Sequence, residues 1–198
     1  MQLTEFQRDA IREVVQIGTG NALTAMAKVV KREIDIEIPT IELCSIEEVP
    51  KKIGSLDMLT LGIYIEVKGD LRGRLLTIFS KKDALKLASM LSGKKVEKLG
   101  DVSIKAVASL GDILAVSNLG AISDFFEMKI HTSPSEIAYD MLGALLQQVL
   151  VDIGQYSDTV LFSKTHIFVS SERFNCLQIF FLESTSLESL LRALEVKV

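Results

Sequence analysis

The sequence predicts an α+β fold in which two long helices pair on one face of a shared antiparallel sheet. Two segments with apolar residues at helical spacing, 4–30 and 101–126, predict the helices. Several shorter segments alternate apolar and polar residues, which is typical of strands. Because helices and strands alternate in blocks along the chain, we expect a layered architecture around a common core.

The first long helix is predicted to begin after Thr4, because Thr4 and Gln7 have the spacing of a capping box. Its apolar residues at helical spacing, which predict a buried stripe, are Ile11, Val14, Val15, Ala22, Met26, Val29 and Val30. Asp9, Glu13 and Gln16 fall at i, i+4 and i+7, so they form one line along the opposite side of the helix. This line of two carboxylates and one carboxamide is the candidate functional site.

Two glycines, Gly18 and Gly20, lie inside this helix, where each costs about 1 kcal/mol relative to alanine. They predict the close approach of another backbone or a local irregularity, and we interpret both as part of a helix-packing contact. A nucleotide-binding loop at residues 18–20 is the alternative. No strand precedes these residues, however, and Leu23 replaces the third glycine of GxGxxG, which argues against that alternative.

The segment between the two long helices is predicted to form strands and one short helix. Residues 33–44 alternate isoleucines with charged residues, and Pro39 marks an edge, a bulge or the end of pairing in this strand. Residues 45–56 are expected to form a loop that can include a helical turn. The remaining predicted elements are a hairpin of strands 59–67 and 73–80 with its turn at 68–70, and a helix over 83–91.

The second half is predicted to repeat this order with one additional helix. After the second long helix we expect, in order, a strand at 128–133, a helix at 137–153, strands at 159–169 and 174–182, and a helix at 186–194. Apolar residues recur at a separation of 96 residues, as in Ile17 with Ile113 and Leu23 with Leu119, and at a separation of 103 residues, as in Leu87 with Leu190. We therefore expect a single domain over residues 1–198 with approximate two-fold symmetry, its halves covering about 1–99 and 100–198.

Composition excludes several classes of protein. A net charge of −4 with lysines scattered along the chain leaves no basic stripe, so nucleic acid is a poor partner. The sequence has neither a signal-peptide pattern nor an uninterrupted apolar run of about 20 residues, so we expect a cytoplasmic protein without membrane insertion. Cys44 and Cys176 stand far apart and outside any CxxC, which argues against a zinc site or a disulfide framework.

The spacing of Asp9, Glu13, Gln16 and Pro39 resembles the signature of the CheC, CheX and FliY phosphatases of bacterial and archaeal chemotaxis. That signature is Asp or Ser, Glu, Asn and Pro at these spacings. The segment QIGTGNALTA, the predicted repeat and the chain length also look like CheC. The resemblance implies a layered α+β fold of two related halves, in which each long helix presents Glu and Asn to the phosphorylated receiver CheY.

By this resemblance, Glu13 takes the role of the Glu and Gln16 that of the Asn, with Asp9 and Pro39 as supporting motif residues. A carboxamide donates and accepts hydrogen bonds at once, so it can position water in line with phosphorus. Glu13 would pair with a lysine of the receiver. The receiver brings its own divalent cation, so we expect this chain to need no cofactor or metal of its own.

Gln16 departs from the signature because glutamine has one more methylene than asparagine. The amide moves by roughly 1 Å, and a misplacement of that size can cost on the order of a hundredfold in rate. The unrelated helical phosphatase CheZ uses a glutamine for the same task, which keeps the functional group competent. We therefore expect weak activity from this site.

The second long helix departs further from the signature. Lys105, Ser109, Asp112 and Ser135 occupy the positions of its leading residue, Glu, Asn and Pro, respectively. An ionised Asp112 cannot donate a hydrogen bond and would repel a phosphoryl group. We interpret Ser109 and Asp112 as a degenerate and inactive second site.

Two functions remain open. The first is a phosphatase for a phosphorylated CheY-type response regulator, acting through Glu13 and Gln16. The second is a non-catalytic binding module, either an adaptor like the switch-protein relatives or a partner of CheD, the receptor deamidase that CheC proteins bind. Exposure of both side chains on an unobstructed helix face would favour the phosphatase, and burial of either would favour the adaptor.

Overall fold

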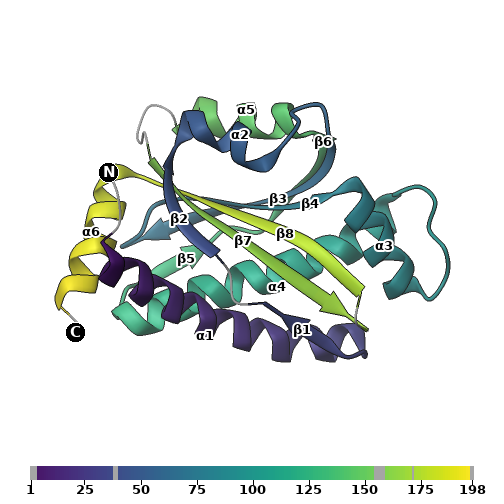
Figure 1. The fold of residues 1–198 in the computed structure, drawn as a ribbon, viewed down its shortest axis with the longest axis horizontal. Helices are drawn as coiled ribbons and strands as arrows, with labels where there is room; N and C mark the ends of the chain where they lie inside the picture. The colour runs from purple at the N-terminus through teal and green to yellow at the C-terminus, as the bar shows by residue number, and fades with distance from the viewer. Residues whose placement is uncertain (1–3, 38–39, 154–158, 171, 197–198) are drawn as a thin grey trace.

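The two longest helices lie side by side on one face of an antiparallel sheet (Figure 1). These are α1 (Glu5–Val30) and α4 (Asp101–Phe126), each of 26 residues. The computed structural model describes residues 4–37, 40–153, 159–170 and 172–196. The α+β class and the pairing of two long helices over a shared antiparallel sheet are thereby confirmed.

Eight described strands form the sheet, and all of their pairings are antiparallel. The strands are β1 (Ile34–Ile36), β2 (Thr40–Ser45), β3 (Leu59–Gly69), β4 (Gly73–Ser80), β5 (Ile130–Thr132), β6 (Glu136–Met141), β7 (Thr159–Val169) and β8 (Glu172–Leu182). Their order is β1-β7-β8-β4-β3-β5, with β2 also paired to β7 and β6 to β3. The internal duplication and the single-domain organisation stay predictions.

The shorter helices cover the opposite face of the sheet or pack against α1 and α4. The helix α5 (Leu142–Ile153) and the short α2 (Val49–Ile53), which follows the 3-10 turn η1 (Ile46–Glu48), cover the face opposite α1 and α4 (Figure 1). The helix α3 (Lys81–Ser92) packs on α4. The last helix, α6 (Ser184–Val196), packs against both α1 and α4.

The start of α1 is fixed by the capping box that the sequence predicts. The backbone N–H of Gln7 donates to Thr4 Oγ1 at 3.1 Å, and the backbone N–H of Thr4 donates to Gln7 Oε1 at 3.0 Å. Two otherwise free backbone donors are thereby satisfied. The helix ends at Lys31, which has a left-handed backbone conformation with φ of 53°. The predicted stripe is buried except at its end, where Val29 is 53% exposed.

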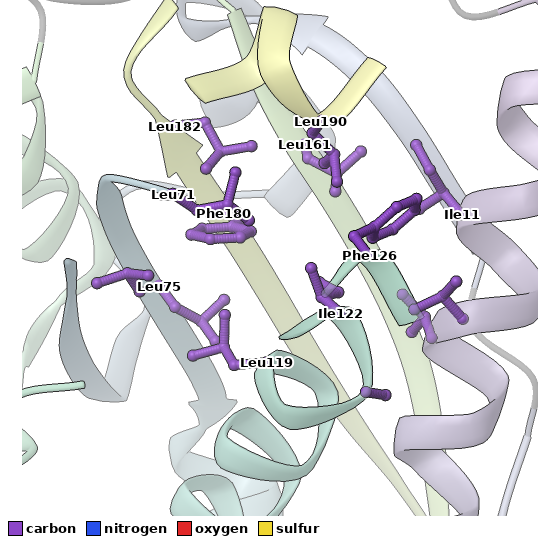
Figure 2. Packing of buried hydrophobic residues seen from close by; sticks show 14 of the residues in the cluster. Ile11, Leu71, Leu75, Leu119, Ile122, Phe126, Leu161, Phe180, Leu182 and Leu190 are labelled. Atoms are coloured by element: carbon purple, nitrogen blue, oxygen red, sulfur yellow. The ribbon is translucent and has the colours of Figure 1, made fainter. Parts of the chain in front are cut away.

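A continuous apolar cluster joins the first half of α1 to α4, α6 and the sheet (Figure 2). Ile11 of α1, Ile122 and Phe126 of α4, Phe180 of β8 and Leu190 of α6 are all at least nine-tenths buried in it. Burying one such side chain contributes about 1.5–3 kcal/mol. The side of α1 opposite the candidate site is therefore packed into the core.

Several predicted elements have other bounds in the structure. The predicted helix 137–153 begins only at Leu142, because residues 136–141 form β6 and pair with β3. The alternating Ile137, Tyr139 and Met141 fit a strand as well as a helix, and the free edge of β3 selects the strand. The hairpin turn lies at residues 70–72, because β3 continues to Gly69.

The predicted strand 33–44 is two strands, β1 and β2, which both pair with β7. Ile38 and Pro39, which stand between them, lie outside the described residues. Cys44 and Cys176 are buried, as expected of small core residues.

The helix α4 is long and apolar enough to span a membrane, judged by length and composition alone, with a mean hydropathy of 1.4 in its most apolar window. Within this fold, 56% of that window is buried. Its buried residues, such as Leu110 and Leu114, pack in the core beneath α1 and α3. The apolar composition of α4 is therefore explained by its packing in the core of this fold.

Candidate functional site

Asp9, Glu13 and Gln16 are all exposed on α1, on the side that faces away from the core. Ile11, Val14 and the next residue, Val15, bury the opposite side of the same turns. None of the three polar side chains makes a hydrogen bond or an ion pair with another residue in the described part of the chain. The line expected from helical spacing is therefore present and open to a docked partner.

The site also has exposed apolar side chains next to it. Ile17 on α1 is 48% exposed and Val116 on α4 is 50% exposed. Each residue directly precedes a close contact between the two helices, which joins Gly18 to Ser117 and Asn118. Apolar and polar side chains mixed on one exposed face are typical of a protein-docking surface.

The helices α1 and α4 approach each other closely at Gly18. A Cβ atom at this position would lie 2.6 Å from both Cα and Oδ1 of Asn118 and 2.9 Å from the carbonyl oxygen of Ser117. Only glycine fits this contact, which confirms the helix-packing interpretation for Gly18. The interpretation is wrong for Gly20, because a Cβ there would meet nothing within 4 Å.

On α4, the side chains of the predicted second site, Ser109 and Asp112, make hydrogen bonds within the chain. Ser135 Oγ, between β5 and β6, donates to Asp112 Oδ2 at 2.9 Å, and Ser109 Oγ donates to the carbonyl oxygen of Ala106 at 2.7 Å. Asp112 Oδ1 is buried and has no hydrogen-bond partner among the described residues. Burial raises the pKa of Asp112, and the hydrogen bond from Ser135 acts in the opposite direction. Lys105 is exposed one turn earlier.

Pro39, the last member of the predicted motif, lies outside the described residues. In the described part of the chain, no group of three or more His, Cys, Asp or Glu side chains is arranged to hold a metal ion. The exposed side chains on α1 offer hydrogen-bonding and charged groups to a partner.

Sequence reasoning missed Asn118, which is 7% exposed on the packed side of α4. The signal that could have revealed it is its position, because Asn118 follows Leu110 and Leu114 at intervals of four within the apolar stripe. A carboxamide in such a stripe must find hydrogen-bond partners inside the core.

Residues 6–43, which include Glu13 and Gln16, match the CheC-like family. The CheY-P phosphatase CheC of Bacillus subtilis (strain 168) is 32% identical over 176 residues, which cover 86% of this chain and 84% of that relative. The chain belongs to the CheC-like family.

Other similarities agree with this CheC-like assignment. The flagellar motor switch phosphatase FliY of Bacillus subtilis (strain 168) is 24% identical over 139 residues, which cover 68% of this chain but only 36% of FliY. The crystal structure of Thermotoga maritima FliY matches with a TM-score of 0.79 and 19% identity, covering 100% of both chains. This structural match shows that the CheC-like chain shares its fold with FliY.

Proposed function

We propose that this CheC-like protein binds a phosphorylated CheY-type response regulator and hydrolyses its aspartyl phosphate from one site. The observation that carries the proposal is the exposure of Glu13 and Gln16 on α1. Neither side chain makes a hydrogen bond or an ion pair with a described residue. The similarity to a CheY-P phosphatase over most of the chain supports this choice of substrate. Burial of either side chain would have favoured the adaptor.

In the proposed reaction, the carboxamide of Gln16 holds a water molecule in line with the phosphorus atom. The amide oxygen accepts a hydrogen bond from the water, and the amide N–H groups donate to the attacking or phosphoryl oxygens. The water oxygen bonds to phosphorus while the bond from phosphorus to the aspartyl oxygen breaks. Inorganic phosphate and the free carboxylate of the receiver are released, together with one proton to solvent.

Glu13 is proposed to orient the docked receiver rather than to react. Its carboxylate lies one turn before Gln16 on the same line, within reach of a cation on the partner surface. Asp9 extends the line by another turn and adds negative charge. The divalent cation that neutralises the phosphoryl group is proposed to belong to the receiver, in the shared cytoplasm, so this chain needs no metal or cofactor.

The second line, on α4, is proposed to be inactive. Asp112 lacks the N–H donors of asparagine, and one of its oxygens already accepts the hydrogen bond from Ser135. Ser109 has no carboxylate with which to orient a partner. Catalysis is therefore assigned to α1 alone.

The decay of a phosphorylated CheY-type receiver, with and without this protein, tests the proposal. Gln16→Ala removes the carboxamide, and Gln147→Ala is the matched control because Gln147 is exposed on α5 on the opposite face of the sheet (Figure 1). We expect wild type and Gln147→Ala to accelerate decay equally and Gln16→Ala to lose at least tenfold. If wild type binds the receiver without accelerating decay, the proposal fails, and a CheC-like adaptor, including a partner of CheD, replaces it.

A further inference from the structure

Three buried polar side chains form a chain of hydrogen bonds through the core beneath α1. Thr77 of β4, Gln178 of β8 and Asn118 of α4 are 1%, 4% and 7% exposed. Gln178 Nε2 donates to Thr77 Oγ1 at 3.2 Å, and Asn118 Nδ2 donates to Gln178 Oε1 at 2.8 Å. Because an unpaired buried amide costs free energy, these bonds hold the Asn118 carboxamide in one orientation above the sheet.

The other end of this chain meets α1. Asn118 Oδ1 is buried and accepts no hydrogen bond from any described residue. The same oxygen lies so close to Gly18 that a Cβ at Gly18 would be 2.6 Å away. The backbone of α1 therefore lies directly on the Asn118 carboxamide.

Packing beside this contact is incomplete. A cavity of about 30 Å³ lies between α1, α4 and the sheet, and Val15, Asn118, Leu119, Gln178 and Phe180 are among the residues that line it. Side chains that border a void lose van der Waals contacts on that side. Val15 therefore packs less tightly on this side, and the contact between Gly18 and Asn118 is one of the constraints on the position of α1 over the sheet, together with the other buried residues of the helix.

We propose that Asn118, held by Gln178 and Thr77, is a positioning residue for the α1 site. Gln16 precedes Gly18 by only two residues, so any displacement of the helix at Gly18 moves the Gln16 carboxamide by a similar distance. A misplacement of about 1 Å can cost on the order of a hundredfold in rate. This inference rests on the proposed function, because its effect on turnover requires Gln16 to act on the phosphoryl group.

The test compares variants of these hydrogen-bonded polar residues with a control variant that removes a buried hydrogen bond on the other face of the sheet. Gln178→Leu removes the acceptor of Asn118 Nδ2 and leaves every exposed residue of α1 unchanged. Tyr64→Phe is the control, because Tyr64 Oη donates at 3.1 Å to the carbonyl oxygen of Leu145 under α5, on the other face of the sheet. We expect Gln178→Leu to lower kcat for receiver dephosphorylation at least tenfold with KM changed less than twofold, and Tyr64→Phe to change neither.

A double variant separates positioning from stability. Asn118→Leu with Gln178→Leu replaces both buried amides by apolar groups, so that neither amide is left unpaired. We expect the free energy of unfolding of this double variant to lie closer to that of wild type than that of Gln178→Leu does, with kcat still reduced at least tenfold. Full activity in Gln178→Leu or in the double variant would overturn the proposal.

Hydrogen exchange of the α1 amides tests the same contact without any catalysis. We expect the amides of residues 14–20 to exchange at least tenfold faster in the double variant than in wild type, and those of α5 to be unchanged. If wild type proves inactive, the proposed function fails and this measurement decides the positioning inference alone. Unchanged protection of residues 14–20 would then overturn it.

Discussion

Ser135 Oγ donates a 2.9 Å hydrogen bond to Asp112 Oδ2, so the carboxylate of the degenerate second site on α4 already has a hydrogen-bond partner within the chain. The residue at the matching place on α1, Gln16, is exposed and has no partner in the described part of the chain. The two long helices therefore differ in what they can offer a partner. One presents a free carboxamide, whereas the other presents a half-buried carboxylate that is already hydrogen-bonded.

Asp112→Asn is expected to stabilise the protein at neutral pH. Burial raises the pKa of Asp112 above its usual 3.8, so its ionised form is disfavoured in the folded state. The stabilising contribution of the protonated carboxyl is complete below the unfolded pKa and is lost as the pH rises through the folded pKa. An asparagine avoids that loss, so we expect a gain of about 1 kcal/mol at pH 7 that shrinks towards pH 4.

Urea unfolding at the two pH values measures this difference, with Asp124→Asn on the exposed side of α4 as the control. The control should change the free energy of unfolding by less than about 0.5 kcal/mol at either pH. A loss of stability in Asp112→Asn at pH 7 would mean that the bond from Ser135 outweighs the burial of the charge.

The parts of the site that follow from local geometry could be predicted from the sequence. The capping box of Thr4 and Gln7 and the exposed line through Glu13 and Gln16 depend only on spacing within one helix. Residues 137–141 could not be assigned in this way, because Ile137 and Met141 fit both the helical and the strand period. The free edge of β3, which is distant in sequence, decides between them.

Contacts between distant segments escaped prediction for the same reason. The bond between Asp112 and Ser135 spans 23 residues, and the bond between Asn118 and Gln178 spans 60. No periodic pattern along one segment encodes such a pair. Gly18 and Gly20 illustrate the same limit of prediction from sequence. The two glycines lie in the same helix, but only Gly18 contacts α4, and the sequence does not show which of them does.

Gly18→Ala and Gly20→Ala are expected to change stability in opposite directions. An added methyl at Gly18 would press on the α4 backbone, and overpacking of this kind costs about 1–3 kcal/mol. The same methyl at Gly20 meets open space, so the better helix propensity of alanine should contribute about 0.5–1 kcal/mol. Thermal unfolding should show a lower Tm for Gly18→Ala and a higher Tm for Gly20→Ala, and equal Tm values would contradict the helix contact.

Gln16→Asn is expected to increase the rate of receiver dephosphorylation by about tenfold. The shorter side chain keeps the carboxamide and restores the residue of the CheC signature, which removes a displacement of roughly 1 Å. Gln16→Glu is the companion variant, because it keeps the length but loses the N–H donors, and it should fall to the level of Gln16→Ala. A slower Gln16→Asn would show that the α1 backbone in this protein is adjusted to the longer side chain.

Glu13→Gln is expected to weaken association with the receiver while leaving the maximal rate nearly unchanged. An exposed charge pair across a docking surface contributes about 0.2–1 kcal/mol, so we expect up to a fivefold rise in KM at low salt. The difference should disappear near 1 M salt, where the Debye length falls to about 3 Å. Glu47→Gln, on the exposed 3-10 turn η1, removes the same charge away from α1 and should show no such change in KM. A fall in the maximal rate of Glu13→Gln at saturating receiver would instead place Glu13 beside the reacting phosphoryl group.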